Sequence, residues 1–336
     1  MNSKSKPTFV EIAKLLIADA ETRVSTGQNS PSLTRNYKDR LRAYGEPFFG
    51  TMKIADIDSR KLREFRDWLA KKGLSASSIL AIMSFVSKVL RLAEDDGVIS
   101  RRPNVPRHGH RDSPRPAFTR AEYQQLLAFL KKVEKGNPTI LVKGKPIDWE
   151  LRSCITFMVN GFLRPGDLFS LRHKHVQVVE ADSEGPEYLR LDPPASKGHE
   201  APIITMPVAV PIYHRVHAAH AKAGYGRPDD YVFMPSFANR PYAKELVRRR
   251  FTTVLRAAGL KETVKGVSRT LYSLRHTAIT FRLLNSENLD LLTLARNCRT
   301  SVEMIDRFYA RSLTAEMNRD KLHSFKRPTR YLPQAA

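Results

Sequence analysis

The sequence predicts a mainly α-helical protein with a small antiparallel β-sheet, an α+β chain of two domains. Three observations lead to this prediction. Apolar residues recur at the three- to four-residue spacing of amphipathic helices through most of the first hundred positions. A stretch rich in proline and arginine follows them. Beyond it, three short runs rich in β-branched and aromatic residues, typical of strands, separate further stretches of helical spacing.

Residues 1–102 are predicted to form a bundle of four amphipathic helices with short polar connections. The second helix is expected to end at Gly45-Glu46-Pro47, because glycine and proline interrupt helices. Helix starts are indicated by short polar side chains that can accept hydrogen bonds from a first turn. The predicted starts, in order, are Thr8, Ser32, Asp58 or Ser59, and Ser75.

The chain is strongly basic, with 57 lysines and arginines against 34 aspartates and glutamates in 336 residues, a formal net charge of +23. This excess favours a polyanionic partner, because neutralised phosphates release counterions; a basic protein without such a partner is the alternative. In the first domain, basic side chains gather on helix faces, where the choice is between a solvated face and a DNA-binding one. The predicted DNA-binding residues are Arg60, Lys61, Arg63, Lys88, Arg91, Arg101 and Arg102.

The two cysteines, Cys154 and Cys298, lie far apart in apolar or helical settings. They indicate a reducing compartment and argue against a disulfide framework or a cysteine-based zinc site. The N-terminus lacks the apolar run of a signal peptide, and no stretch is expected to span a membrane. We therefore expect a cytoplasmic protein without a membrane partner.

Residues 103–117 are predicted to be a stiff basic linker, since they hold four prolines among arginines. His108 and His110 lie in this linker without partnering ligands nearby, so a metal site is not predicted there. Residues 317–336 are predicted to be a basic C-terminal tail.

Residues 118–316 are predicted to form the second domain, which opens with a capping box of Thr119 and Glu122. Three expected strands form its small sheet, and Lys197 lies on the loop between the second and third. Histidines repeat every third residue at His214, His217 and His220, a spacing better suited to a helix face than to zinc. The expected strands are 171–179, 188–191 and 202–208, and the expected helices are 149–162, 208–223, 243–258, 273–284 and 289–297.

Four short motifs occur in the second domain in a fixed order. Together they resemble the tyrosine recombinases, the phage-integrase family, over about the last two-thirds of the chain. The first domain resembles the core-binding domain of that family at Phe48-Phe49-Gly50, 54–57 and Gly73-Leu74-Ser75. The motifs are Gly161-Phe162-Leu163-Arg164-Pro165-Gly166-Asp167, Ser196-Lys197-Gly198, Tyr272-Ser273-Leu274-Arg275-His276-Thr277, and Asp306-Arg307-Phe308-Tyr309.

The resemblance implies an enzyme that cleaves and rejoins DNA at specific recombination sites, for integration or excision. Tyr309 would be the nucleophile and would form a 3′-phosphotyrosyl intermediate. Arg164 and Arg275 would bind the phosphate, because a guanidinium donates paired hydrogen bonds and stays charged. Lys197 would protonate the leaving 5′ oxygen. The resemblance also implies that no metal or other cofactor takes part and that four protomers act on double-stranded DNA.

Two positions depart from the family pattern. Tyr272 stands where the family has a histidine, and a phenol with an ordinary pKa near 10 is a poor base. Thr300 falls, by counting back from Tyr309, where a histidine or tryptophan is expected. Tyr272 and Thr300 are both candidate catalytic residues. Beside them, Asp167 is predicted to orient an arginine, and His276 is predicted to have a structural role.

Two other functions remain open on the sequence alone. A type IB topoisomerase-like enzyme would share this chemistry but relax DNA as a monomer. A non-catalytic DNA-binding protein of the same fold is the alternative that the changes at Tyr272 and Thr300 keep open.

Overall fold

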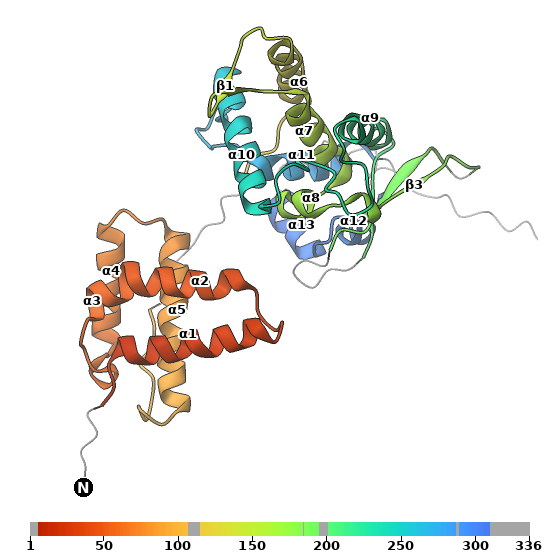
Figure 1. Cartoon of the computed structure of the whole chain (residues 1–336). Helices are drawn as coiled ribbons and strands as arrows, with labels where there is room; N and C mark the ends of the chain where they lie inside the picture. The colour runs from red at the N-terminus through yellow and green to blue at the C-terminus, as the bar shows by residue number, and fades with distance from the viewer. Residues whose placement is uncertain (1–5, 107–114, 184, 195–200, 287–288, 310–336) are drawn as a thin grey trace, which may run out of the picture. The chain divides into compact units, whose positions relative to one another are not determined.

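The computed structural model describes residues 6–106, 115–183, 185–194, 201–286 and 289–309. The chain divides into two compact units, residues 1–113 and 114–336 (Figure 1). Each unit has its own cluster of buried apolar side chains. The division falls within the stretch predicted to be a linker.

The N-terminal unit is built from two pairs of helices. In Figure 1, α1 and α2 run side by side and cross α4 and α5. Phe9, Phe49 and Phe65 are completely buried between them, with ring centroids 4.3–4.8 Å apart. The helices are α1 (Phe9–Ser25), α2 (Pro31–Arg40), α4 (Ser59–Lys71) and α5 (Ala76–Asp95).

The predicted caps of this bundle are confirmed at three starts. Thr8 forms a capping box with Glu11 at the start of α1. The Asp58 carboxylate accepts a hydrogen bond from the Lys61 amide at 2.7 Å, and the Ser75 hydroxyl caps α5 in the same way. The second helix starts slightly before Ser32, because Ser30 is its cap and Pro31 its first residue.

The predicted break at Gly45-Glu46-Pro47 is wrong, because the backbone stays helical there. A π-helical turn, η1 (Leu41–Gly45), leads directly into α3 (Glu46–Phe49). Pro47 lies in the first turn of α3, where a helix tolerates a missing backbone N–H. The helix ends at Gly50, whose φ of 48° suits a residue without a side chain. The 3₁₀ turn η2 (Ile54–Asp56) then leads to α4.

The expectation that no stretch approaches a membrane span is too strong for α5. By length and mean hydropathy this helix passes as a span, although a core helix can pass the same test. Eight of its residues are buried against the rest of the bundle, including Phe85, Val86 and Leu90. Its apolar character is therefore accounted for by core packing.

The C-terminal unit is organised around α7, which packs against α6, α9, α10 and α11. Its side chains are buried on nearly every face, and the strongly apolar sequence of this helix reflects that position. The helices are α6 (Arg120–Glu134), α7 (Trp149–Gly161), α8 (Pro165–Ser170), α9 (Ala209–Lys222), α10 (Arg240–Ala257), α11 (Leu271–Asn285), α12 (Leu291–Asn297) and α13 (Val302–Tyr309).

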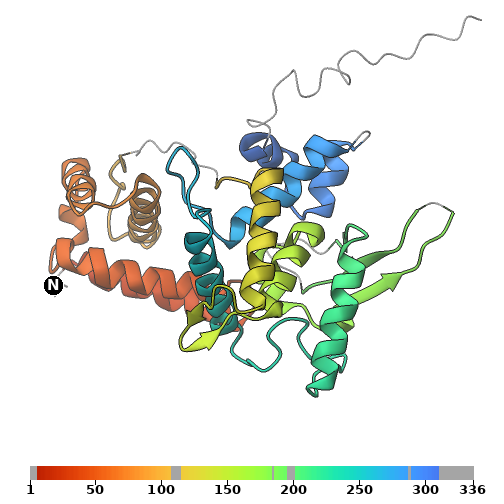
Figure 2. The same cartoon turned by 90° about the horizontal axis from the view of Figure 1, so that it is seen from above.

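A three-stranded antiparallel sheet flanks these helices, with strand order β3-β4-β5. Val176 pairs with Leu191, and Leu191 with Ile203. The hairpin of β3 and β4 extends away from the helices in both views (Figures 1 and 2). The mainly α fold with a small antiparallel sheet is thus confirmed. The strands are β3 (Val176–Val179), β4 (Tyr188–Leu191) and β5 (Ile203–Ile204).

The first predicted strand begins five residues too early. Residues before Val176 form the 3₁₀ turn η3 (His173–His175), and Arg172 makes only an isolated bridge to Tyr231. A two-stranded hairpin, β1 (Leu141–Val142) with β2 (Lys145–Pro146), was not predicted. Its turn places the non-glycine Lys143 at a φ of 53°, a conformation that the sequence does not signal.

Candidate active site

Arg164 is positioned by the end of α7. Phe162 adopts the left-handed conformation, with φ of 56°, and stops that helix. Two residues later Arg164 is the N-cap residue of α8, in extended conformation, and its side chain is only 14% exposed. The abrupt stop followed by a short helix holds this arginine on ordered backbone.

Arg275 projects from α11 into the interior and is 2% exposed. Its guanidinium donates one hydrogen bond to the carbonyl of Phe162 and another to the carbonyl of Cys298. A buried charge needs hydrogen-bond partners, and main-chain carbonyls supply them here without neutralising it. The left-handed residue that ends α7 therefore also orients the second arginine of the site.

The turn after α12 provides the matching contact for the first arginine. Arg299 has a φ of 48°, and its carbonyl accepts a hydrogen bond from Arg164. The carbonyl immediately before it, that of Cys298, accepts from Arg275. Two adjacent carbonyls of one turn thus hold the two guanidiniums that the sequence predicts to bind phosphate.

One guanidinium nitrogen of Arg164 takes no part in these hydrogen bonds. Its Nη1 atom is buried and has no hydrogen-bond acceptor among the residues that the structure describes. The nearest carboxylate oxygen, Oδ2 of Asp167, lies 3.7 Å away, an ion pair rather than a hydrogen bond. Asp167 therefore lies where it was predicted to act, beside an arginine. A buried donor without an acceptor is suited to an incoming anion.

Tyr309 ends α13 and is 6% exposed. Its ring packs on the His276 imidazole, with centroids 4.8 Å apart and planes inclined by 31°. Burial raises the pKa of the Tyr309 phenol well above its ordinary value, while the charge of Arg275 and a hydrogen bond from it act in the opposite direction. The phenol is therefore neutral at rest and beside a guanidinium.

His276 contacts a second tyrosine besides Tyr309: the ring centroid of Tyr272, on the same helix, is 5.3 Å from that of the imidazole. Burial, together with the charges of Arg275 and Arg115, lowers the pKa of His276 to about 4. The imidazole is thus neutral near pH 7 and acts as a packing surface for Tyr309. The structural role predicted for His276 would consist of this packing against Tyr309.

The two departures from the family pattern occupy different environments. Tyr272 is half-buried at the start of α11 and lines a cleft of about 620 Å³ that Arg164 also lines. Thr300 is half-buried, and its amide donates to the Ala295 carbonyl at 2.9 Å. Its neighbour Arg299 is the buried residue of the pair, at 1% exposure. Counting back from Tyr309 therefore selects Thr300, whereas its neighbour Arg299 makes the buried side-chain contacts.

Lys197, the predicted general acid, lies outside the described residues. The described chain stops at Pro194 and resumes at Ala201, so the predicted place of Lys197 between β4 and β5 is defined by its flanking strands alone.

The cleft beside Arg164 has basic walls that sequence reasoning missed. Lys244 and Arg248 contribute to it from α10, and Arg115 from the segment before α6. Glu245 pairs with Arg248 at 2.6 Å, but both side chains are solvent-exposed and such pairs are weak. The four-residue spacing of Lys244 and Arg248, which places them on one helix face, was the available signal.

The predicted DNA-binding residues of the N-terminal unit lie on its surface. Arg60 and Lys61 pair with Glu64, at 3.4 and 2.6 Å, and Arg91 with Asp95 at 3.7 Å. The Lys88 ammonium donates to the Tyr37 hydroxyl at 2.6 Å. The ion pairs with Glu64 and Asp95 are solvent-exposed, so each contributes little to stability and leaves its cation open to competition from phosphate. Arg63 is likewise exposed on α4.

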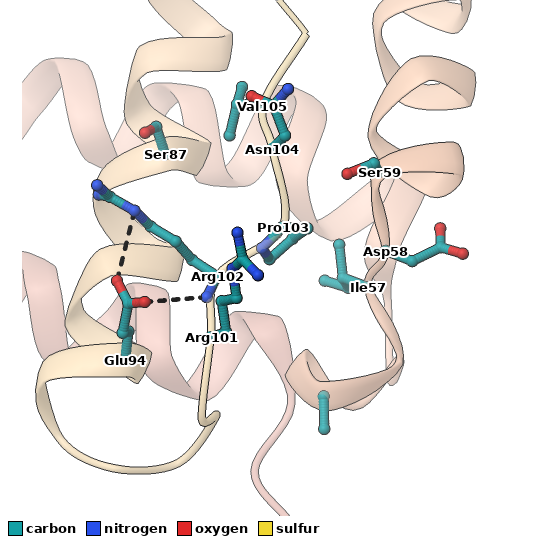
Figure 3. Close-up of a pocket in the computed structure, with 11 residues that line it drawn as sticks. Ile57, Asp58, Ser59, Ser87, Glu94, Arg101, Arg102, Pro103, Asn104 and Val105 are labelled. Atoms are coloured by element: carbon teal, nitrogen blue, oxygen red, sulfur yellow. Dashed lines mark hydrogen bonds and ion pairs between the residues drawn. The ribbon is translucent and has the colours of Figure 1, made fainter.

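Arg101 and Arg102 lie at the edge of a cavity of about 960 Å³ within the same unit (Figure 3). Glu94 holds Arg102 twice, through its backbone amide at 3.1 Å and its guanidinium at 3.4 Å. This pairing fixes the chain as it leaves the bundle. Arg101 is exposed beside it.

Across the described parts of the chain, no group of three histidine, cysteine or acidic side chains is arranged to hold a metal ion. The helical histidines make other contacts: His217 lies 4.7 Å from the ring of His173, and His220 is 3.2 Å from a Glu150 carboxylate oxygen. Burial raises the pKa of the Cys298 thiol to about 12, so it is not a reactive thiolate.

Comparison with known proteins adds a domain-family match for the N-terminal unit and a fold for the whole chain. Residues 8–107 match the family model of the phage integrase SAM-like domain. Over 94% of this chain and 98% of the other, the structure is similar to the Tn1549 transposon integrase in complex with transposon right end DNA, with a TM-score of 0.66 and 17% identity. The chain has the integrase fold.

A lambda integrase tetramer bound to a Holliday junction shares the integrase fold with a TM-score of 0.64 and 18% identity, over 90% of this chain and 80% of that one. A lambda integrase dimer bound to a COC′ core site gives a TM-score of 0.62 at 16% identity, over 94% and 79% of the two chains. No curated protein matches the sequence. The resemblance to the phage-integrase family is thus confirmed, through the SAM-like domain and the fold.

Proposed function

We propose that this protein is a site-specific tyrosine recombinase that cleaves and rejoins DNA strands through a 3′-phosphotyrosyl intermediate. The observation that carries the proposal is the meeting of Arg164, Arg275 and Tyr309 around one turn, where a buried Arg164 nitrogen has no acceptor within the described part of the chain. A DNA phosphate placed there would take up that donor. The integrases of similar fold are bound to DNA in their structures, which supports the same substrate class here.

The proposed reaction is an in-line displacement at phosphorus. The Tyr309 phenol loses its proton to solvent as its oxygen bonds to phosphorus, and the bond from phosphorus to the 5′ oxygen breaks. Arg164 and Arg275 stabilise the negative charge on the nonbridging oxygens. Lys197 supplies the proton that the departing 5′ oxygen takes up. Rejoining reverses these steps with the 5′-hydroxyl of a partner strand, so the tyrosyl ester conserves the phosphodiester energy.

Double-stranded DNA containing specific recombination sites is the proposed partner, and a tetramer is the proposed assembly. The net charge of +23 and the exposed cations on α4, α5 and α10 support DNA as the partner. The proposed tetramer rests on the lambda integrase tetramer of similar fold.

The decisive experiment is capture of the covalent intermediate. The protein is incubated with nicked DNA from its own flanking locus, and the products are separated under denaturing conditions. Tyr309→Phe removes only the nucleophilic oxygen, so we expect the adduct to disappear while DNA binding survives. Tyr242→Phe removes an oxygen from an exposed tyrosine of α10 and should leave the adduct unchanged.

Three results would redirect the proposal. An adduct that persists in Tyr309→Phe would show that another residue attacks the phosphate. DNA binding by wild type without any adduct would favour the non-catalytic DNA-binding protein. Relaxation of supercoiled DNA by a monomer, without strand exchange between sites, would favour the topoisomerase-like enzyme.

A further inference from the structure

The end of α12 is fastened to the β-sheet by side-chain contacts on both sides of the turn. The Asn297 carboxamide accepts a hydrogen bond from the Ile204 amide at 2.7 Å and donates to the Ile204 carbonyl at 3.0 Å. Two residues later the Arg299 side chain also points to the sheet. The turn is therefore held through side chains to β5 as well as through its own helix.

Arg299 makes the second of these attachments. Its Nε atom donates to the Ala201 carbonyl at 2.6 Å, and its Nη1 atom to the Pro193 carbonyl at 3.1 Å. Pro193 follows the end of β4, and Ala201 precedes β5. A rigid guanidinium fork that bonds two carbonyls beside the ends of neighbouring strands fixes both the position and the orientation of the residue that carries it.

This attachment has a reason beyond packing. Burial lowers the pKa of the Arg299 guanidinium and Arg164 lowers it further, while the carboxylates of Asp167 and Asp192 raise it, so the cation is desolvated close to another cation. A buried guanidinium next to Arg164 is costly unless hydrogen bonds and nearby carboxylates compensate for its lost hydration, so its hydrogen bonds to main-chain carbonyls must be kept. The backbone of Arg299 is also left-handed, a conformation that non-glycine residues rarely adopt.

The main chain of the same turn carries the contacts of the proposed active site. The Cys298 carbonyl accepts from Arg275 and the Arg299 carbonyl from Arg164. Movement of this turn would therefore move both guanidiniums at once. Together with the Asn297 carboxamide, the side-chain fork of Arg299 ties the turn that carries these two carbonyls to the sheet.

We propose that Arg299 is a positioning residue: its fork to Pro193 and Ala201 locks the turn whose carbonyls set the placement of Arg164 and Arg275 on the scissile phosphate. This inference rests on the proposed recombinase function. Arg299 itself does not touch the phosphate in this scheme. Its effect must pass through the two arginines that do.

The test compares cleavage of an ordinary phosphodiester with cleavage of a methylphosphonate at the same position. A methylphosphonate lacks the nonbridging negative charge, so it depends much less on correctly placed guanidiniums. We expect Arg299→Met to slow single-turnover cleavage of the phosphodiester by about 10–10²-fold, the scale of a small misplacement of catalytic groups. On the methylphosphonate the same change should cost less than about threefold, because the interaction it disturbs is largely absent.

Methionine keeps a side chain at this left-handed position, whereas glycine would also relax the backbone. Arg299→Lys retains the charge but loses the planar fork, and should show the same substrate dependence with a smaller defect. Arg296→Met is the matched control, since it removes the same charge from an exposed position three residues earlier and should cleave like wild type.

Equal defects of Arg299→Met on the two substrates would overturn the proposal, since they would point to general loss of structure or of DNA binding. Hydrogen exchange provides a measurement that does not need catalysis. The amides of Arg299 and Thr300, bonded to Arg296 and Ala295 at 2.9 Å each, should exchange faster in Arg299→Met but not in Arg296→Met. Unchanged exchange would overturn the locking role.

The two hypotheses can fail separately. If wild-type protein forms no adduct, the recombinase function fails, and the exchange experiment alone decides whether Arg299 locks the turn. If wild type forms the adduct and Arg299→Met cleaves normally, the function stands and the positioning role is wrong.

Discussion

Arg275, on α11, donates a hydrogen bond to the main-chain carbonyl of Cys298. It spans α11 and the end of α12, and a second bond ties it to Phe162 at the end of α7. A guanidinium can make both bonds and still present further N–H donors to a phosphate. Three elements of the fold thus meet at one side chain.

Arg275→Lys should therefore fail although it preserves the charge. An ammonium cannot satisfy two buried carbonyls and a phosphate in the same planar arrangement. We expect the free energy of unfolding to fall by about 1–3 kcal/mol and strand cleavage by about 10²–10³-fold. Denaturant unfolding and single-turnover cleavage measure the two effects, with Arg296→Lys as the exposed control. Cleavage at the wild-type rate would show that the fork is unnecessary.

Tyr272 should act as a hydrogen-bond donor to a nonbridging phosphate oxygen rather than as a base. It lies one helical turn before Arg275 on α11 and lines the cleft that contains Arg164. We expect Tyr272→Phe to slow cleavage by about 10–10³-fold, the scale of losing one such donor, and Tyr272→His to restore most of the rate. The pH–rate profile checks the role: a donor leaves its shape unchanged, whereas loss of an ascending limb in Tyr272→Phe would identify a base.

Acid should destabilise the C-terminal unit through two buried histidines. Burial is the main cause that lowers the pKa of His276 and of His173 to about 4. Both imidazoles stay neutral in the folded protein, while the unfolded chain takes up protons near pH 6.5. Their stabilising contribution is fully present above pH 6.5 and is lost as the pH falls toward 4, by at most about 1.4 kcal/mol per pH unit for each imidazole.

Urea unfolding between pH 7 and pH 4 measures this loss. His276→Asn should reduce the slope of unfolding free energy against pH over that interval. His214→Gln, at an exposed position on α9, should leave the slope as it is in wild type. Identical slopes in all three proteins would mean that His276 titrates normally in the folded state.

DNA affinity should depend steeply on salt. The exposed cations of both units would displace counterions from several phosphates, so binding should weaken by a factor on the order of 10³ between low and moderate salt. Titrations at several salt concentrations give the slope of log K against log[salt]. Lys244→Met, in the cleft beside Arg164, should make that slope shallower by about one. A flat plot for wild type would rule out phosphate contacts as the main source of affinity.

Much of the fold was predictable because its signals are local. Thr8 and Asp58 cap helices with their own side chains, and the strand Tyr188–Leu191 was predicted with its correct ends. The predicted helix break at Pro47 is wrong because no sequence pattern indicates the π-helical turn that keeps the backbone helical before it. Local pattern therefore predicts elements better than it predicts what joins them.

The candidate site shows the same limit. Arg164, Arg275 and Tyr309 could be named from their motifs, and the structure brings them together. The carbonyls that anchor the two arginines could not be predicted, because nothing in the sequence indicates that Phe162 and Arg299 adopt the left-handed conformation. Thr300 was selected by counting, while the buried contacts belong to Arg299, a distinction that only side-chain burial reveals.

The carboxamide of Asn297 has a consequence for the solubility of the protein. An outer strand with unpaired N–H and C=O groups invites another chain to add to it and so begins aggregation. By bonding to both backbone groups of Ile204 at the outer side of β5, Asn297 occupies the place of such a strand. Since the Ile204 side chain is itself half exposed and apolar, Asn297 shields the β5 edge from pairing with another chain, and Asn297→Ala should precipitate at lower concentration than wild type.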